Sequence, residues 1–147
     1  MQPDHAHPTE AEVRQLMDDW ASALRARDVD RLLSFYAPGA VFFDAIGPLQ
    51  MDAGPFRKNW DEFFQWFPGP VKVETRNLKI SAGESLAFAR LLVRLVGTTA
   101  EGKEEGAWMR ETIGFEKAGA SWRITHEHWS MSMDMKTGKA AHDLKPE

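Results

Sequence analysis

The chain of 147 residues has no cysteine and no long apolar run. The missing cysteine excludes a disulfide framework and any zinc or iron–sulfur site held by thiolates, and it fits a reducing compartment. No apolar segment approaches the ~20 residues that a transmembrane helix needs, and the polar start MQPDHAHPTE is unlike a signal peptide. A Gly-rich phosphate-binding loop is also missing. We therefore expect a cytoplasmic protein that uses no metal and no cofactor and has no membrane partner.

Basic residues are too scattered for a nucleic-acid-binding surface. The chain carries 18 Lys and Arg against 22 Asp and Glu, which gives a net charge of −4. Domains that bind a phosphate backbone carry clustered Lys and Arg instead. We therefore expect no nucleic-acid partner.

Large apolar aromatic residues are abundant. Nine Phe and six Trp stand against a single Tyr, and hydrophobic residues make up 43% of the chain. Such side chains can line a cavity as well as fill a core. The length fits one domain, which we assign to residues 9–133. Residues 1–8 are expected to form a disordered lead and residues 134–147 a polar C-terminal tail.

Three segments have apolar residues at the spacing of one helical face. The first begins at Thr9, the second follows Asp28, and the third begins near Pro55, which suits a first helical position because that position needs no amide. The second is expected to end at the turn 37–39. The inward-facing residues predicted for the three helices are Val13, Leu16, Met17, Trp20, Ala21, Leu24, Val29, Leu32, Leu33, Tyr36, Phe56, Trp60, Phe63, Phe64 and Phe67.

Strand patterns occupy most of the remaining chain. A short strand is predicted at 40–44, with 49–51 pairing back onto it, and four long strands follow at 71–80, 86–96, 107–116 and 122–133. Three helices gathered on one face of a curved, mostly antiparallel sheet make an α+β fold. A long twisted sheet that wraps around a helix forms a cone-shaped barrel with an open mouth, and such mouths hold ligands.

Three sequence stretches resemble a known group of proteins. They are WASALRARDVDRLLSFYAPGAVFFDAIG at 20–47, RETIGFEK at 110–117 and WRITHEHWS at 122–130. They resemble ketosteroid isomerases and, most closely, the broad SnoaL-like group of the nuclear-transport-factor-two-like superfamily, over residues 9 to about 133. The resemblance implies a cystatin-like, ketosteroid-isomerase-like fold with a hydrophobic pocket. It says little of function, because this fold carries out several chemistries.

The resemblance also suggests roles for single residues. Asp44 stands where ketosteroid isomerases keep their general base, and Trp20 stands where they keep an oxyanion-hole Tyr. The second oxyanion donor, a protonated Asp, falls near Glu111. A Trp donates one N–H but is not a phenolic acid. Thr112, two residues after Arg110, departs from the Asp-Arg-Asp arrangement of limonene-type epoxide hydrolases, which argues against that activity.

Asp44, Arg110 and His126 are the candidate catalytic residues. Asp44 ends an apolar strand, where a desolvated carboxylate suits a base near neutral pH, but an Asp here also fits a cap of the following turn. Arg110 is expected either inside, paired with an acid or a ligand carboxylate, or on the outer face of the sheet. His126 and His128 share a strand face, and two ligands alone do not make a metal site.

The last long strand leaves its inward face ambiguous. Its apolar start at Trp122 and Ile124 favours the face that carries His126, whereas an alignment through Trp129 favours the opposite face, and a bulge could switch faces within the strand. We assign His126 to the pocket. The candidate substrate-binding residues are Trp20, Tyr36, Phe42, Trp60, Phe64, Trp108 and His128. For Trp20, Trp60 and Tyr36 a plain core role is the alternative.

The outer face of the sheet is expected to meet a second subunit. The strand 86–96 is apolar on both faces apart from Arg90 and Arg94, and a sheet apolar on both faces is covered on both. We therefore expect a homodimer through the sheet.

Two functions remain open. In the first, Asp44 moves a proton next to the carbonyl of a small apolar molecule, and Arg110, His126 or the Trp20 indole stabilises the oxyanion. In the second, the protein is a non-catalytic module for ligand binding or dimerisation. The position of Asp44 distinguishes the two, because a base lies beside the cavity and a turn cap lies in solvent.

Overall fold

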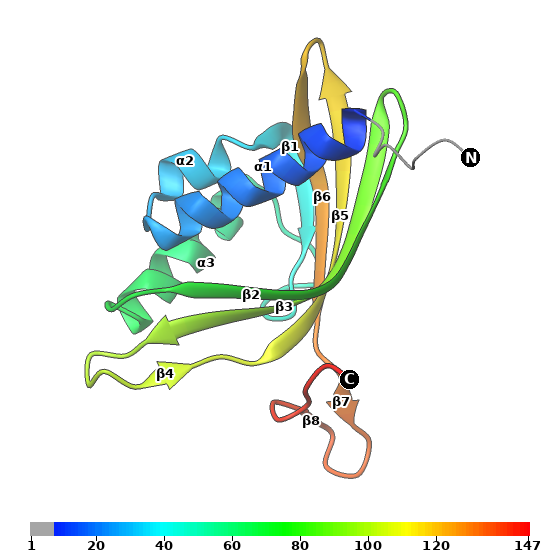
Figure 1. Cartoon of the computed structure of the whole chain (residues 1–147). Helices are drawn as coiled ribbons and strands as arrows, with labels where there is room; N and C mark the ends of the chain where they lie inside the picture. Colours follow the sequence, from blue (N-terminus) through cyan, green and yellow to red (C-terminus); the bar gives the residue numbers. More distant parts are fainter. Residues whose placement is uncertain (1–7) are drawn as a thin grey trace.

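The computed structural model describes residues 8–147, so the predicted lead falls outside the described residues except for Pro8. Three helices and one strand precede the long strands (Figure 1). The elements are α1 (Pro8–Arg25), α2 (Val29–Leu33), β1 (Tyr36–Phe43), α3 (Ala53–Trp66), β2 (Lys72–Ala82), β3 (Leu86–Thr98), β4 (Glu104–Glu105), β5 (Trp108–Ala118), β6 (Ser121–Ser130), β7 (Met133–Asp134) and β8 (Lys139–Ala140).

The helices begin near the predicted residues. α1 begins one residue before Thr9, and its apolar stripe lies in the core, with Val13 and Leu24 fully buried. Asp28 caps α2 by accepting a hydrogen bond from the amide of Arg31 at 3.0 Å. Such a cap satisfies an amide that the first turn of a helix leaves free. Among residues 8–147, none of the helices combines the length and the apolar character required of a membrane span.

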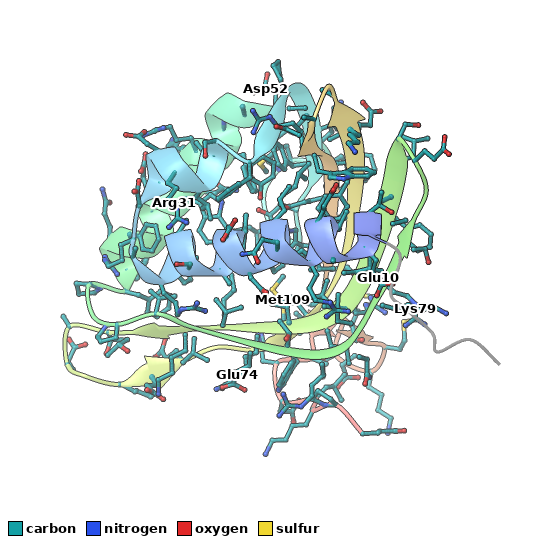
Figure 2. The ribbon with its side chains drawn as sticks, turned by 45° about the horizontal axis from the view of Figure 1, so that its top comes forward. Glu10, Arg31, Asp52, Glu74, Lys79 and Met109 are labelled. Carbon is teal, nitrogen blue, oxygen red and sulfur yellow. The ribbon has the colours of Figure 1, made fainter. Side chains whose placement is uncertain are left out.

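The sheet confirms the predicted α+β fold. The strands lie in the order β1-β6-β5-β3-β2; β2, β3, β5 and β6 form an antiparallel meander, and β1 runs parallel to β6. Figure 1 shows the helices on the concave side of this strongly bent sheet. Figure 2 shows Glu74 of β2 on the other side of the sheet, away from α1. β1 and β2 are the two edges and do not pair, so the cone stays open and is not a closed barrel.

β1 begins earlier than the sequence pattern indicated. Tyr36 was predicted in the second helix, but it opens β1 and pairs with Ile124. The residues predicted to end the helix lie within β1 instead, and the register shifts between Tyr36 and Val41. An edge strand tolerates Pro38 because its ladder is incomplete, and Gly39 takes the positive φ of 79°. The strand predicted at 49–51 is reduced to one bridge between Met51 and Phe42.

A bulge in β6 decides which side chains face the helices. Gly114 pairs with His126 and Phe115 with Ile124, so Thr125 is an extra residue on β6. Inward-facing positions therefore change parity at this point. Ile124 faces the core before the bulge, and Glu127 faces it afterwards. The predicted possibility of a switch is confirmed, whereas the assignment of His126 to the pocket is wrong.

The side chain of Arg27 joins the end of α1 to the end of α3. Its guanidinium donates hydrogen bonds to the carbonyl oxygens of Phe64, Phe67 and Gly69 at 2.9, 2.7 and 3.0 Å. It also lies 4.6 Å from the centroid of the Phe64 ring. Carbonyls at the C-terminal end of a helix lack partners within the helix, so Arg27 fixes the place where α3 ends.

The polar tail contains local structure. β7 and β8 form a two-stranded hairpin, in which Met133 pairs with Ala140 and Asp134 with Lys139. The amide of Ala141 donates to the carbonyl oxygen of Ser132 at 2.8 Å. Figure 1 shows this hairpin beyond the end of β6, away from the helices.

Gly97 provides a test of how closely α3 packs on the sheet. A Cβ at this position on β3 would lie 2.1 Å from Cγ of Phe67, which follows α3. We expect Gly97→Ala to lower the free energy of unfolding by roughly 1–3 kcal/mol, because Phe67 has to move. The control is Gly114→Ala on β5, where the nearest atom to a Cβ is at 3.7 Å and the expected change is within about 0.5 kcal/mol. Equal urea midpoints for the two variants would contradict the packing described.

Candidate functional site

A cavity of about 400 Å³ lies between α3, the start of the loop after β1, and the inner face of the sheet. Most of its wall is apolar. Trp60 and Phe63 come from α3, Met109 from β5 and Trp129 from β6, and Figure 2 shows Met109 on the side of the sheet that faces α1. A concave apolar site with few polar groups is typical of a pocket for a small molecule.

The main polar group near the end of β1 is the carboxylate of Asp44. Its Oδ1 accepts a hydrogen bond from the amide of Ala45 at 2.7 Å, and its Oδ2 accepts one from Nδ2 of Asn59 at 3.2 Å. Asn59 lies on α3 and also approaches Sδ of Met51 at 3.6 Å. Asp44 and Asn59 both line the cavity. Asp44 thus borders the cavity, and its carboxylate accepts one hydrogen bond from the next residue and one from α3.

A buried hydrogen-bonded network lies behind one wall of the cavity. Nε1 of Trp20 donates to the hydroxyl of Tyr36 at 2.8 Å, and that hydroxyl donates to Oε1 of Glu127 at 2.6 Å. Oε2 of Glu127 accepts from Nε1 of Trp129 at 3.0 Å. Glu127 is only 1% exposed. The network joins α1, β1 and β6, and reaches the cavity through the Trp129 ring.

Burial changes the protonation of two carboxyl groups on the inner face of the sheet. Burial raises the pKa of Glu127 to about 7, although the hydrogen bonds from Tyr36 and Trp129 work in the opposite direction. Burial and the nearby charge of Glu127 raise the pKa of Glu111 well above its usual range. Burial, followed by the charge of Glu127, also raises the pKa of Tyr36. Both carboxyl groups on the inner face of the sheet thus favour the protonated form more than an exposed Glu does.

Of the predicted site residues, Asp44 and Trp60 line the cavity. Trp20 lies next to Trp60, with ring centroids 5.8 Å apart, but it does not reach the cavity surface. Tyr36 is buried with its hydroxyl satisfied. Phe42 stacks on Phe56, with ring centroids 3.8 Å apart. Tyr36 and Phe42 therefore belong to the core, because the first strand turns them toward the helices and other aromatic rings cover them.

The two predicted histidines lie on the outer face of the sheet. Nδ1 of His126 is 2.6 Å from the carbonyl oxygen of Val41, which accepts its hydrogen bond. His128 is exposed, and both imidazoles contact the ring of Phe43 edge-on. Their predicted place in the pocket is wrong, because the bulge at Thr125 turns them outward.

Three other predicted residues also lie outside the cavity lining. Arg110 is exposed, and its guanidinium donates to Oγ of Ser130 at 3.0 Å. This is the outer-face alternative, so the interior position is wrong. Trp108 also does not line the cavity, and Arg76 lies 5.8 Å from its ring centroid. Phe64 lies against Arg27, while its neighbour Phe63 reaches the cavity.

Sequence reasoning missed Asn59, Met109, Glu127 and Trp129. Glu127 and Trp129 lie on the face of β6 that the sequence analysis did not assign to the pocket. An isolated Gly114 inside a strand pattern is a recognised sign of a bulge, and Thr125 lies beside it, with its hydroxyl 3.3 Å from the carbonyl oxygen of Gly114. No three of the His, Asp and Glu side chains in the described part of the chain are grouped to hold a metal ion.

The raised pKa values predict that stability falls as pH rises. Between the ordinary Glu value of 4.5 and the folded value of about 7 for Glu127, the folded state holds a proton that the unfolded state releases. This contribution is complete below about pH 4.5 and is lost as pH rises through about 7. We expect the free energy of unfolding, measured with urea at pH 5 and pH 8, to drop by roughly 1–3 kcal/mol more in the wild type than in Glu127→Leu.

The control for this pH effect is Glu116→Leu, which changes an exposed carboxylate on β5. It should keep the pH dependence of the wild type. An identical pH slope in the wild type and in Glu127→Leu would contradict a raised pKa at Glu127.

The fold and the site place the chain among known proteins. Its structure is similar to that of a nuclear-transport-factor-two-like protein of unknown function from Pseudomonas putida KT2440, with 35% identity, a TM-score of 0.82, and coverage of 96% of this chain and 100% of the other. It is also similar to a proposed scytalone dehydratase from Novosphingobium aromaticivorans, with 13% identity, a TM-score of 0.75 and coverage of 95% of both chains.

A third similar structure is a cystatin-like protein from Caulobacter vibrioides, with 14% identity, a TM-score of 0.67, and coverage of 88% of this chain and 94% of the other. At 13–14% identity, these last two likenesses concern the fold alone. The comparison with curated proteins gave no match. Residues 13–134 match the family described as the SnoaL-like domain. The chain therefore belongs to the SnoaL-like family, with a nuclear-transport-factor-two-like fold.

Proposed function

We propose that the protein binds a small, largely apolar carbonyl compound in the cavity of about 400 Å³ and that Asp44 moves a proton next to the carbonyl. The observation that carries this proposal is the position of the Asp44 carboxylate. It borders a mostly apolar cavity and is oriented by the Asn59 amide at 3.2 Å. A carboxylate oriented beside an apolar cavity in this way supports the role of a general base.

The reaction would proceed in two proton transfers. Asp44 takes a proton from the carbon next to the carbonyl, and the electron pair of the broken C–H bond moves toward the carbonyl oxygen. The carboxyl group then returns the proton to another atom of the substrate. Isomerisation, aldol-type cyclisation and dehydration all use the first of these steps, so the proposal names a reaction class.

The developing oxyanion needs a hydrogen-bond donor. Arg110 and His126 were the expected donors, but both lie on the outer face. The N–H of Trp20 is already used by Tyr36. Trp60 lines the cavity, and its Nε1 is buried without a hydrogen-bond partner among the described residues. We assign the oxyanion to this indole N–H.

A non-catalytic module is the second candidate function. Oδ1 of Asp44 is already engaged by the amide of Ala45, which leaves the carboxylate less free to accept a proton from a ligand. On the outer face of the sheet, Phe88 of β3 is 49% exposed, and half-buried Leu92 points to the same side. An apolar strip of this kind suits a sheet-to-sheet homodimer. In this alternative, the cavity holds a ligand without changing it.

The substitution Asp44→Asn separates the two functions. It keeps the shape of the side chain but removes its ability to accept a proton. Ligands are found by thermal unfolding against steroids, aromatic polyketide-like ketones, terpenoid ketones and small carboxylates, since a ligand of the folded state raises the melting temperature. For a ketone that binds, we expect Asp44→Asn to lower turnover about 10²–10⁴-fold, with the thermal shift preserved.

The control is Asp61→Asn, which changes an exposed carboxylate on the same helix as Asn59. It should keep both turnover and the thermal shift. Full turnover in Asp44→Asn would rule out Asp44 as the base. Binding without turnover in the wild type would favour the non-catalytic module.

A further inference from the structure

A second cavity, of about 190 Å³, lies between α1 and the sheet. Trp20 lines this cavity and Trp129 lines the first one, with ring centroids 6.4 Å apart, so the two indoles stand between the cavities. The lining also includes the exposed residues Asp18 and Arg25 of α1 and Thr75 of β2. The second cavity therefore opens to solvent between α1 and β2, which lie close together in Figure 1.

Two buried carboxyl groups interrupt an apolar wall in this cavity. Leu16, Leu91 and Val93 are among the apolar lining residues, and Glu111 and Glu127 lie among them. Both oxygens of Glu127 accept hydrogen bonds. Glu111 is 5% exposed, and its Oε2 is buried without a partner among the described residues. A buried polar atom without a partner is costly, and here it belongs to a residue that lines a cavity.

The charges around the two carboxyl groups are mostly negative. No ion pair joins Glu111 or Glu127 to a basic side chain of residues 8–147. Tyr36 faces Glu127 from β1, and the charge of Asp44 also acts on Glu127. At the rim, α1 contributes one negative side chain, Asp18, and one positive side chain, Arg25, and both are exposed. The buried part of the cavity thus offers acid groups and apolar surface, and Arg25, the basic residue of its lining, lies exposed at the rim.

We propose that the second cavity binds a small amine with a compact apolar body, whose ammonium group donates hydrogen bonds to Glu111 and lies near Glu127. The ammonium supplies the missing partner of Glu111, and the apolar body contacts the aliphatic wall. This site is separate from the proposed catalytic cavity and does not depend on Asp44.

Proton linkage distinguishes an amine from a neutral ligand. Burial and mutual repulsion raise the pKa of Glu111, and burial raises that of Glu127. A bound ammonium favours the charged carboxylates, so binding releases protons and tightens as pH rises from 6 to 8. A carbonyl compound that accepts a hydrogen bond from protonated Glu111 would show the opposite trend, and its affinity would fall as pH rises from 6 to 8.

The test compares benzylamine with benzyl alcohol, which has a similar body without the charge. Binding is followed by NMR of methionine methyl groups, because Met17 lines the second cavity while Met109 and Met131 line the first. We expect benzylamine to shift the Met17 methyl signal, to bind at least about tenfold more tightly than benzyl alcohol at pH 8, and to bind more tightly at pH 8 than at pH 6.

Variants locate the charge. Glu111→Gln should weaken benzylamine binding about tenfold or more, and Glu116→Gln, an exposed change on the same strand, should leave it unchanged. The proposal is overturned if no amine binds, if Met109 shifts in place of Met17, if benzyl alcohol binds equally well, or if affinity falls with rising pH. All four of these outcomes are measured on the wild-type protein, so they hold even if Glu111→Gln does not fold.

Discussion

The carboxyl group of Glu127 organises the interior of this protein. It is buried in the sheet, and each of its oxygens accepts one hydrogen bond, from the Tyr36 hydroxyl and from the Trp129 indole. A buried carboxyl without partners costs several kcal/mol, so these neighbours cannot vary freely. Tyr36 reaches Glu127 because it is the first residue of β1, which pairs with β6. Its hydroxyl also accepts a hydrogen bond from Nε1 of Trp20 on α1. One buried acid therefore links helix, edge strand and central strand.

The same requirement accounts for the shape of both cavities. Holding Glu127 and Trp129 inward after Ile124 is possible only because Thr125 is an extra residue in β6. Trp129 then forms part of one cavity wall and Trp20 part of the other. The hollow interior of this SnoaL-like protein is thus divided by two indoles that are themselves held by hydrogen bonds. The hydrogen bonds of Trp20 and Trp129 therefore divide the interior into two cavities, and the many apolar side chains of the chain make the cavity walls apolar.

The fold could be predicted from the sequence because its signals are periodic. The stripe on α1, the Asp28 cap and the four-strand meander all follow from spacing and turn residues. Residues that line the cavity were predicted only where a side chain lies on a regular element or at its end, as for Trp60 and Asp44. His126 was placed wrongly because alternation fails at a bulge, and a bulge depends on the partner strand. Arg110 could not be placed because its strand alternates between two faces that both carry polar residues.

Function is less determined than fold for a related reason. A SnoaL-like cone supplies an apolar volume, and the chemistry depends on which few polar groups border it. Here those groups come from the end of β1, from α3 and from the inner face of the sheet, which are distant in sequence. Tyr36, the only phenol of the chain, serves the internal network and is not free to act on a ligand.

The hydrogen bonds of Arg27 to the end of α3 have a consequence for how this cavity can evolve. A single guanidinium holds three carbonyl oxygens at the end of α3, yet it does not line the cavity. The end of one cavity wall is thus held by a residue outside the cavity lining. A substitution at Arg27 would remove these hydrogen bonds while every lining residue stayed the same, so relatives with identical lining residues need not have cavities of identical shape.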